Sequence, residues 1–131
     1  MKKFSLGKYQ RIRGQKIISR LFADGIFFYT ENMQVAVLKT DFKNENIFFG
    51  FSVPKKKIPK AVKRNLIKRL LKESVRLQKN QLSEHMNISN YSLHVFLIWQ
   101  SKKIPDFEWC FSEIEKIFSH IIVNRHKIPA K

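Results

Sequence analysis

Residues 60–73 have the sequence KAVKRNLIKRLLKE, in which aliphatic residues recur at the spacing of an amphipathic helix. The pattern extends to residues 58–80 and predicts one long helix there. The predicted apolar side of this helix consists of Val62, Leu66, Ile67, Leu70, Leu71, Ser74 and Leu77. The strands predicted around it need a cover, so we expect this side to face a sheet.

The opposite side of the same helix carries cations with almost no acidic residue between them. Its members are Arg64, Asn65, Lys68, Arg69, Lys72, Arg76 and Lys79, with Glu73 at the seam. An ordinary soluble helix mixes in glutamates, because each i,i+4 ion pair contributes a few tenths of a kcal/mol. A row of uncompensated cations therefore predicts a polyanionic partner, whose phosphates Arg and Lys bind.

Outward from this helix, apolar periodicity and turn residues predict the other elements. These are helix 10–24, a short aromatic strand 26–30, strands 33–39, 47–53 and 93–99, and helix 107–124. Gly25 suits the end of the first helix, Pro54 ends a strand, and Asp106 caps the last helix. We expect a loop over residues 81–92. The order predicts a small α+β sandwich in one domain, 1–131, with residues 125–131 as a flexible basic tail.

The positive charge is confined to two segments. The 131 residues include 26 Lys and Arg against 10 Asp and Glu, a formal net charge of +16. Residues 1–20 hold seven basic residues and no acid, and residues 55–79 hold eleven basic residues and one acid. A solubilising coat needs no such segregation, so the pattern again favours a polyanion as partner.

Composition excludes several classes of protein. The one cysteine, Cys110, excludes an internal disulfide and a multi-cysteine zinc site. No apolar run is long enough to cross a bilayer or to act as a signal peptide, so we expect a cytoplasmic protein. A basic amphipathic helix can also lie on anionic lipid, but then its apolar side would be free of the sheet.

The acidic and histidine residues do not form the pattern of a protein nuclease. The densest acidic group, residues 106–115, lies in the first turns of the last predicted helix, where the helix dipole favours it. The four histidines show no metal-ligand spacing. We therefore predict no catalytic side chain and no metal held by protein residues.

The central segment resembles a known family. Residues 60–73, together with the preceding GFSVPKK of residues 50–56, are similar to the signature strand, turn and helix of the bacterial ribonuclease P protein component. Residues 20–25, RLFADG, match the end of that family's first helix, and Phe4, Leu6 and Arg11 also fit. The similarity runs from about residue 4 to residue 79 and continues more loosely to residue 124.

The resemblance implies a four-stranded sheet with three helices in the order α-β-β-β-α-β-α and a left-handed crossover around the long helix. It implies a protein that binds the catalytic RNA and the 5′ leader of precursor tRNA and promotes Mg²⁺-dependent removal of the leader, with the Mg²⁺ held mainly by RNA. No membrane and no obligate protein partner are expected. The implied contacts with the catalytic RNA are Lys55, Lys56, Lys57, Lys60, Arg64, Asn65, Lys68, Arg69, Lys72 and Arg76. The leader candidates are Arg11, Arg13, Ile18, Phe22 and an exposed sheet aromatic, Phe48 or Phe49.

The sequence departs from the family at two of these places. Leu66 replaces the second arginine of the usual Arg-Asn-Arg, and Ile18 replaces an aromatic residue of the first helix. The alternative hypothesis is a non-catalytic RNA-binding module, such as a ribosomal protein with a similar sandwich. A self-sufficient nuclease is a third possibility, which the scattered carboxylates disfavour.

Overall fold

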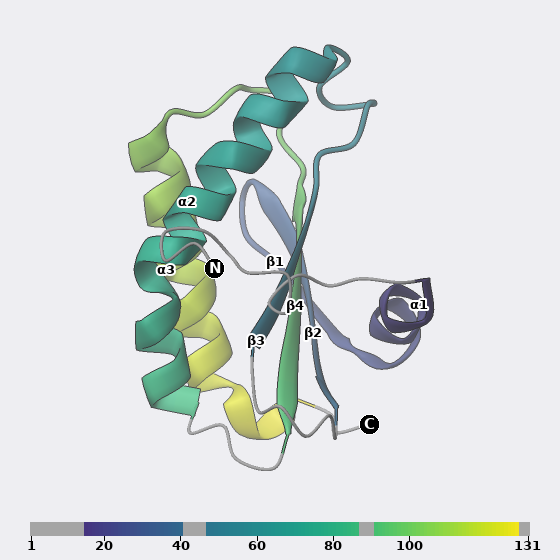
Figure 1. Cartoon of the computed structure of the whole chain (residues 1–131), viewed down its shortest axis with the longest axis vertical. Helices are drawn as coiled ribbons and strands as arrows, with labels where there is room; N and C mark the ends of the chain where they lie inside the picture. The colour runs from purple at the N-terminus through teal and green to yellow at the C-terminus, as the bar shows by residue number, and fades with distance from the viewer. Residues whose placement is uncertain (1–14, 41–46, 87–90, 129–131) are drawn as a thin grey trace, which may run out of the picture.

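A computed structural model gives the fold and describes residues 15–40, 47–86 and 91–128 (Figure 1). The elements are α1 (Gln15–Asp24), β1 (Ile26–Tyr29), β2 (Met33–Thr40), β3 (Ile47–Ser52), α2 (Ala61–Met86), β4 (Ser92–Trp99), α3 (Phe107–Val123) and a 3₁₀ turn (Arg125–Lys127). This order confirms the predicted α-β-β-β-α-β-α sandwich.

The four strands form one mixed sheet in the order β1-β2-β4-β3. The β1–β2 and β2–β4 pairs are antiparallel, whereas β3 and β4 are parallel, with Phe48 beside His94. A parallel pair needs a crossover connection, and α2 provides it. The left-handed sense of that crossover stays a prediction.

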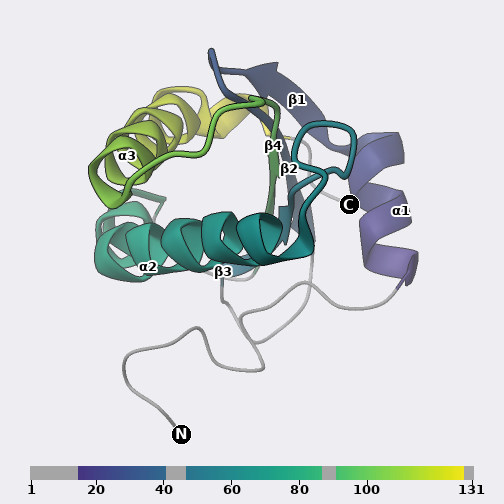
Figure 2. The same ribbon diagram turned by 90° about the horizontal axis from the view of Figure 1, so that it is seen from above.

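The helices lie on both faces of the sheet. Figures 1 and 2 show α2 and α3 side by side on one face and α1 on the other. The main core lies under α2 and α3, where Val35, Phe49 and Val95 meet Ile67 and Ile114. A smaller cluster of Leu21, Ala36 and Leu38 lies under α1. Consecutive strand residues point to opposite faces, so each strand serves both layers.

Two details of the predicted α2 were wrong. The helix runs to Met86, so residues 81–86 are helical and not a loop, because Leu82 and Met86 continue the buried stripe. The stripe is also rotated from the predicted one: Val75 is fully buried, whereas Val62 and Leu77 are 77% and 50% exposed. The predicted stripe followed the leucines, while the observed one also buries the polar Ser74 and Gln78.

The ends of α1 and α3 follow from local chemistry. Gly25 ends α1 by donating its N–H to the Leu21 carbonyl at 3.0 Å, and a Cβ at this position would lie 2.5 Å from that oxygen. Asp106 begins α3, as predicted, by accepting the Trp109 N–H at 2.8 Å. The predicted tail does not start at Arg125, because a 3₁₀ turn follows α3 and Ile128 is buried in the main core.

Across the described residues, no helix combines the length and the apolar character that a membrane span requires.

Candidate nucleic-acid interface

The cationic residues of α2 lie on the flank and outer side of a helix that is anchored in the core. Ile67 and Leu71 are fully buried, one helical turn apart, which fixes the rotation of the helix. That rotation leaves Asn65, Arg69 and Lys72 exposed and Arg64, Lys68 and Arg76 half-buried. The predicted polar side therefore lies at or near the surface.

This flank of α2 lies beside the edge strand β3. The Lys72 ammonium sits 6.0 Å from the centre of the Phe51 ring, a cation–π contact between the helix and the strand. The side-chain stem covers apolar surface and the charge stays exposed. The contact therefore holds Lys72 in place without neutralising it.

Arg76 is paired with an acidic residue of the same helix. Its Nε donates to Glu73 Oε1 at 2.9 Å, and its Nη2 donates to the other carboxylate oxygen. The Arg76 hydrogen bond lowers the pKa of Glu73, and the same bond raises the pKa of Arg76. Glu73 thus offsets one charge of the row, and Arg76 contributes less than an unpaired cation to a phosphate site.

Arg64 has partners in the turn before the helix. Its Nη1 donates to the carbonyl oxygens of Ile58 at 3.0 Å and Pro59 at 2.7 Å. The turn is closed further by the N–H groups of Lys57 and Ile58, which both donate to the Pro54 carbonyl at 3.1 Å. Arg64 therefore fixes the Lys-rich turn in front of α2, a positioning role that the sequence did not reveal.

The Lys-rich turn presents its cations at the amino-terminal end of α2. Lys55, Lys56 and Lys60 are exposed, and Lys57 is half-buried. The amino-terminal end of a helix attracts anions through its free N–H groups and its dipole. The turn and the helix flank together form one continuous basic surface, which we call the α2 basic surface: residues 55–57 and 60, with Asn65, Lys68, Arg69 and Lys72.

Aromatic rings gather on the opposite face of the sheet, beside α1. The Phe22 ring of α1 stacks on Phe27 of β1 at 5.8 Å between centroids and meets Phe96 of β4 edge-on at 5.7 Å. Phe22 is 41% exposed and Phe27 is 37% exposed, so these rings are only partly used for packing. We call Phe22, Phe27 and Phe96 the aromatic cluster.

A buried histidine lies on the same face as the aromatic cluster. His94 of β4 stacks on Phe48 of β3 at 5.1 Å, and its Nε2 lies 3.0 Å from the Thr40 hydroxyl. Burial, and then the positive charge of Arg20 on α1, lower the pKa of His94 to about 4. His94 is thus neutral at pH 7 and is buried together with Phe48 on this face of the sheet.

Polar side chains border this face where β1 and β4 end and β2 begins. Gln100 Nε2 donates to Gln34 Oε1 at 3.2 Å, and Gln34 Nε2 donates to the Tyr29 hydroxyl at 3.3 Å. Tyr29 is 69% exposed. The row joins β4, β2 and β1 and gives the face hydrogen-bonding groups next to its rings.

The predicted leader residues are placed differently from one another. Phe22 and Phe48 lie on the α1 side of the sheet, Phe22 exposed and Phe48 nearly covered. The prediction for Phe49 was wrong. Its side chain points to the other face because neighbouring strand residues alternate. It is 1% exposed, and its ring centroid lies 5.9 Å from that of Phe118. Ile18 lies in α1, one turn before Phe22. Arg11 and Arg13 lie outside the described residues.

Sequence reasoning missed Phe27, Phe96 and His94. A signal existed in the strand alternation: Phe27 and Tyr29 share one face of β1, and His94, Phe96 and Ile98 share one face of β4. The strand order, which the sequence did not determine, brings these two sets next to Phe22.

The other titratable groups do not form a reaction centre. In the described part of the chain, no three His, Cys, Asp or Glu side chains gather as a metal site would require. Burial, and then the charges of Asp106 and Glu113, raise the pKa of Cys110 to about 12, so the thiol stays protonated. Glu113 is buried and accepts the Thr30 hydroxyl at 2.9 Å, which ties α3 to the sheet.

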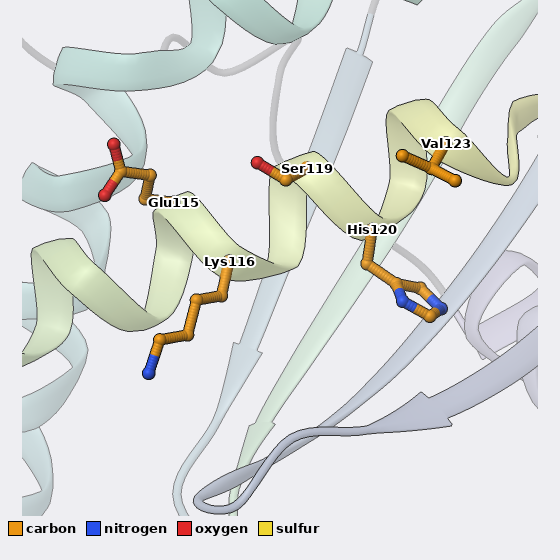
Figure 3. A pocket seen from close by; sticks show the side chains of 5 residues that line it. All are labelled: Glu115, Lys116, Ser119, His120 and Val123. Carbon is orange, nitrogen blue, oxygen red and sulfur yellow. The ribbon is translucent and has the colours of Figure 1, made fainter.

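An open hollow of about 500 Å³ on α3 also lacks a catalytic arrangement, and Figure 3 shows the side chains that line it. Glu115 and Lys116 line it with opposite charges, and Ser119 and His120 lie further along the helix. The His120 ring lies 4.1 Å from the centre of the Phe28 ring, so it packs against β1.

Known proteins resemble this chain over most of its length. The family model "Ribonuclease P" matches residues 6–122. The ribonuclease P protein component of Chlorobium phaeobacteroides is 31% identical over 128 residues, covering 89% of this chain and 88% of the relative. The component of Syntrophus aciditrophicus is 35% identical over 88 residues, covering 67% and 71%.

Two solved structures share the fold. The RNase P protein of Staphylococcus aureus aligns with a TM-score of 0.69 at 20% identity, covering 84% of this chain and 93% of that one. The RNase P protein of Thermotoga maritima aligns with a TM-score of 0.67 at 21% identity, covering 85% and 96%.

Proposed function

Because the chain belongs to the ribonuclease P protein family and is a protein subunit of that ribonucleoprotein endoribonuclease of tRNA processing, we propose that its two surfaces bind different RNAs. The α2 basic surface binds the catalytic RNA. The aromatic cluster binds the single-stranded 5′ leader of precursor tRNA. The subunit thereby promotes removal of the leader and formation of the mature 5′ end.

The observation that carries the proposal is the row of cations held on a fixed helix. Lys68, Arg69 and Lys72 follow one another around the flank of α2, and Glu73, the acidic residue within this stretch of the helix, is bonded to Arg76. Like charges so close repel one another, so the row costs stability until an anion offsets it. Six phosphate contacts would make the affinity fall steeply with salt, with a log–log slope of about −0.7 to −0.9 for each contact.

The leader site rests on different chemistry. Exposed aromatic rings stack on unpaired bases of any sequence, at about 1–3 kcal/mol for each base. Phe22 is the best-placed ring, because it is exposed and is held from two sides by Phe27 and Phe96. A duplex offers no free base faces, so such a site selects the single-stranded leader over mature tRNA.

The reaction itself is assigned to the RNA partner. The described residues offer no cluster of ligands for Mg²⁺, so the proposal places the metal on RNA and derives no chemical step from side chains. What the protein supplies is charge: lysines and arginines on phosphate ease the repulsion between the two RNAs, and the required Mg²⁺ then binds more readily. A cytoplasmic location and the lack of an obligate protein partner stay predictions.

Reconstitution tests this proposal. The purified protein should not cleave precursor tRNA alone, and it should accelerate cleavage by a bacterial ribonuclease P RNA at low Mg²⁺. Cleavage without RNA would show a self-sufficient nuclease. No acceleration with RNA, despite binding to other structured RNA, would favour the general RNA-binding module.

A further inference from the structure

A second basic site lies on the other flank of α2, away from β3, and shares Lys57 and Lys60 with the α2 basic surface. An open hollow of about 310 Å³ is formed where the turn before α2 meets the connection from β4 to α3. It is lined by Lys57, Lys60 and Lys63 from the turn and α2 and by Lys102 from the connection, and no acidic residue is among the described residues that line it. Neither Lys63 nor Lys102 was predicted as an RNA contact.

The inside of this hollow is apolar. Ile58, Pro59 and Ile104 line it between the lysines. Ile58 belongs to the main core, whereas Ile104 is 45% exposed. One exposed isoleucine is ordinary on a protein surface. Three apolar side chains among four cations are a different arrangement, because they suit a ligand with a flat apolar part and a strongly anionic part.

Both walls of the hollow are fixed by hydrogen bonds. On the α2 side, Arg64 holds the carbonyls of Ile58 and Pro59. On the other side, the Trp99 indole N–H donates to the Lys103 carbonyl at 3.3 Å, and the Lys103 N–H donates to the Ser101 hydroxyl oxygen at 3.0 Å. Both walls are therefore formed before any ligand arrives, which reduces the entropy lost on binding.

Charge, and not size, distinguishes this hollow from others. The hollow on α3 (Figure 3) is larger, at about 500 Å³, but Glu115 and Lys116 give it no net charge. The hollow beside Lys63 is at the lower end of the roughly 300–1,000 Å³ of small-ligand sites. It has room for one small group, not for a duplex or an extended peptide.

We propose that this hollow binds a single unstacked nucleotide of the catalytic RNA, with the base on Ile104 and Pro59 and the adjoining phosphates on Lys63 and Lys102. The proposal rests on the proposed function, because it takes that RNA as the partner. Bases in bulges and loops are free to leave the stack and bind an apolar surface. The RNA contact would then pass around the amino-terminal end of α2 and reach the β4–α3 connection.

Binding of the full chain to a bacterial ribonuclease P RNA, measured over a range of salt concentrations, tests this site. Lys102→Ala should weaken binding about sixfold at 0.1 M salt and reduce the log–log slope by about 0.8, because one phosphate contact is lost. Ile104→Ser should weaken binding about fivefold and leave the slope unchanged, because it removes an uncharged contact. Chemical probing should show at least one RNA nucleotide that the wild type protects and Ile104→Ser does not.

Matched controls come from the same chain. Lys127→Ala removes an exposed cation from the 3₁₀ turn, and Val123→Ser removes a side chain that is 68% exposed at the α3 hollow. Both should bind RNA within twofold of wild type. All variants should unfold at the wild-type temperature, since each altered side chain is exposed.

The outcomes separate this site from the proposed function. If Lys102→Ala and Ile104→Ser bind like wild type while Lys68→Ala/Arg69→Ala loses affinity, the nucleotide site is wrong and the α2 basic surface stands. If the wild type does not bind the RNA, both proposals fail. If a polyglutamate peptide binds with the same dependence on Lys102 and Ile104 as the RNA, the hollow serves an acidic protein partner and the inference is overturned.

Discussion

The α2 basic surface and the aromatic cluster lie on opposite layers of one sheet and offer different chemistry. Lys68, Arg69 and Lys72 present charge on a helix that is fixed by the main core. Phe22, Phe27 and Phe96 present rings over a much smaller cluster under α1. Charge on a rigid helix suits a large folded RNA, whereas exposed rings suit a single strand. In the proposed function, the two surfaces would then bind two RNAs without competition between them.

The largest expected effect concerns the core that supports both surfaces. Phe49→Ala should lower the free energy of unfolding by about 3–5 kcal/mol, because the ring is fully buried between the sheet and α3. Phe22→Ala, a ring that is 41% exposed, is the matched control and should cost much less. Chemical denaturation measures both. Equal losses would mean that Phe22 belongs to the core and that the aromatic cluster is not a binding surface.

The next effect is a dependence of stability on pH that comes from His94, on the aromatic side of the sheet. His94 is folded in its neutral form, with a pKa lowered from 6.5 to about 4. Its unfolded form takes up a proton first, so stability is fully present above about pH 6.5 and falls as the pH drops toward 4, by up to about 3 kcal/mol. His94→Gln removes this dependence while keeping a group that can bond to Thr40. The difference in the free energy of unfolding between the wild type and His94→Gln should be smaller at pH 4.5 than at pH 7.5. The same difference at both pH values would contradict a buried neutral histidine.

Charge removal should then separate the two surfaces. Lys68→Ala/Arg69→Ala should weaken binding to the catalytic RNA by about 40-fold at 0.1 M salt and reduce the log–log slope by about 1.6, the share of two phosphate contacts. Lys116→Ala/Lys127→Ala removes the same charge from exposed positions on α3 and the turn after it, and should leave the slope nearly unchanged. Filter binding over 0.05–0.5 M salt, about the range in which such slopes are measured, gives both numbers. An unchanged slope for the first variant would show that the helix is not the contact.

Removing a ring should affect only the substrate that carries a leader. Phe22→Ala should weaken binding of precursor tRNA to the holoenzyme about tenfold, at the lower end of the energy of one stacked base. Binding of mature tRNA should stay the same, and the salt slope should not change. The ratio of the two dissociation constants is the measurement. An equal loss for both tRNAs would assign Phe22 to packing.

The smallest effect is a gain. Leu66→Arg restores the arginine usual in the family at a half-exposed position of α2 and should tighten RNA binding about sixfold, with a slope steeper by about 0.8. Leu77→Arg adds the same charge three turns further along the same flank, where the side chain is 50% exposed. A similar gain from both variants would indicate general attraction instead of a specific contact.

Much of the fold follows from periodicity in the sequence. The strands around Val35, Phe49 and Val95 and the cap at Asp106 were predictable, because alternation and capping are local. The true end of α2 was not predictable. Leu82 and Met86 follow a polar stretch, and they are buried in the main core that α2 shares with α3. The predicted rotation of α2 was wrong for a related reason. Gln78 is buried because it donates to the Phe111 carbonyl of α3 at 3.0 Å, and a helical wheel of α2 alone cannot show this contact.

The two surfaces were unequally predictable. The α2 basic surface lies in one continuous segment, so charge order alone located it. The aromatic cluster joins α1, β1 and β4, and only the strand order β1-β2-β4-β3 brings Phe27 and Phe96 to Phe22. A choice between Phe48 and Phe49 required knowing which face of the sheet each side chain of β3 points to. Arg64 was assigned to RNA because its charge was visible, while its bonds to the turn were not.

Cross-linking in living cells tests the role of the α2 basic surface most directly. A photoreactive benzophenone residue at position 69 replaces an exposed arginine of that surface, and the same residue at exposed position 108 on α3 is the control. Irradiation should join position 69 to the ribonuclease P RNA and leave position 108 without that product. If position 69 yields no such RNA, or yields it no more than position 108 does, the account of how this protein binds its ribozyme is wrong.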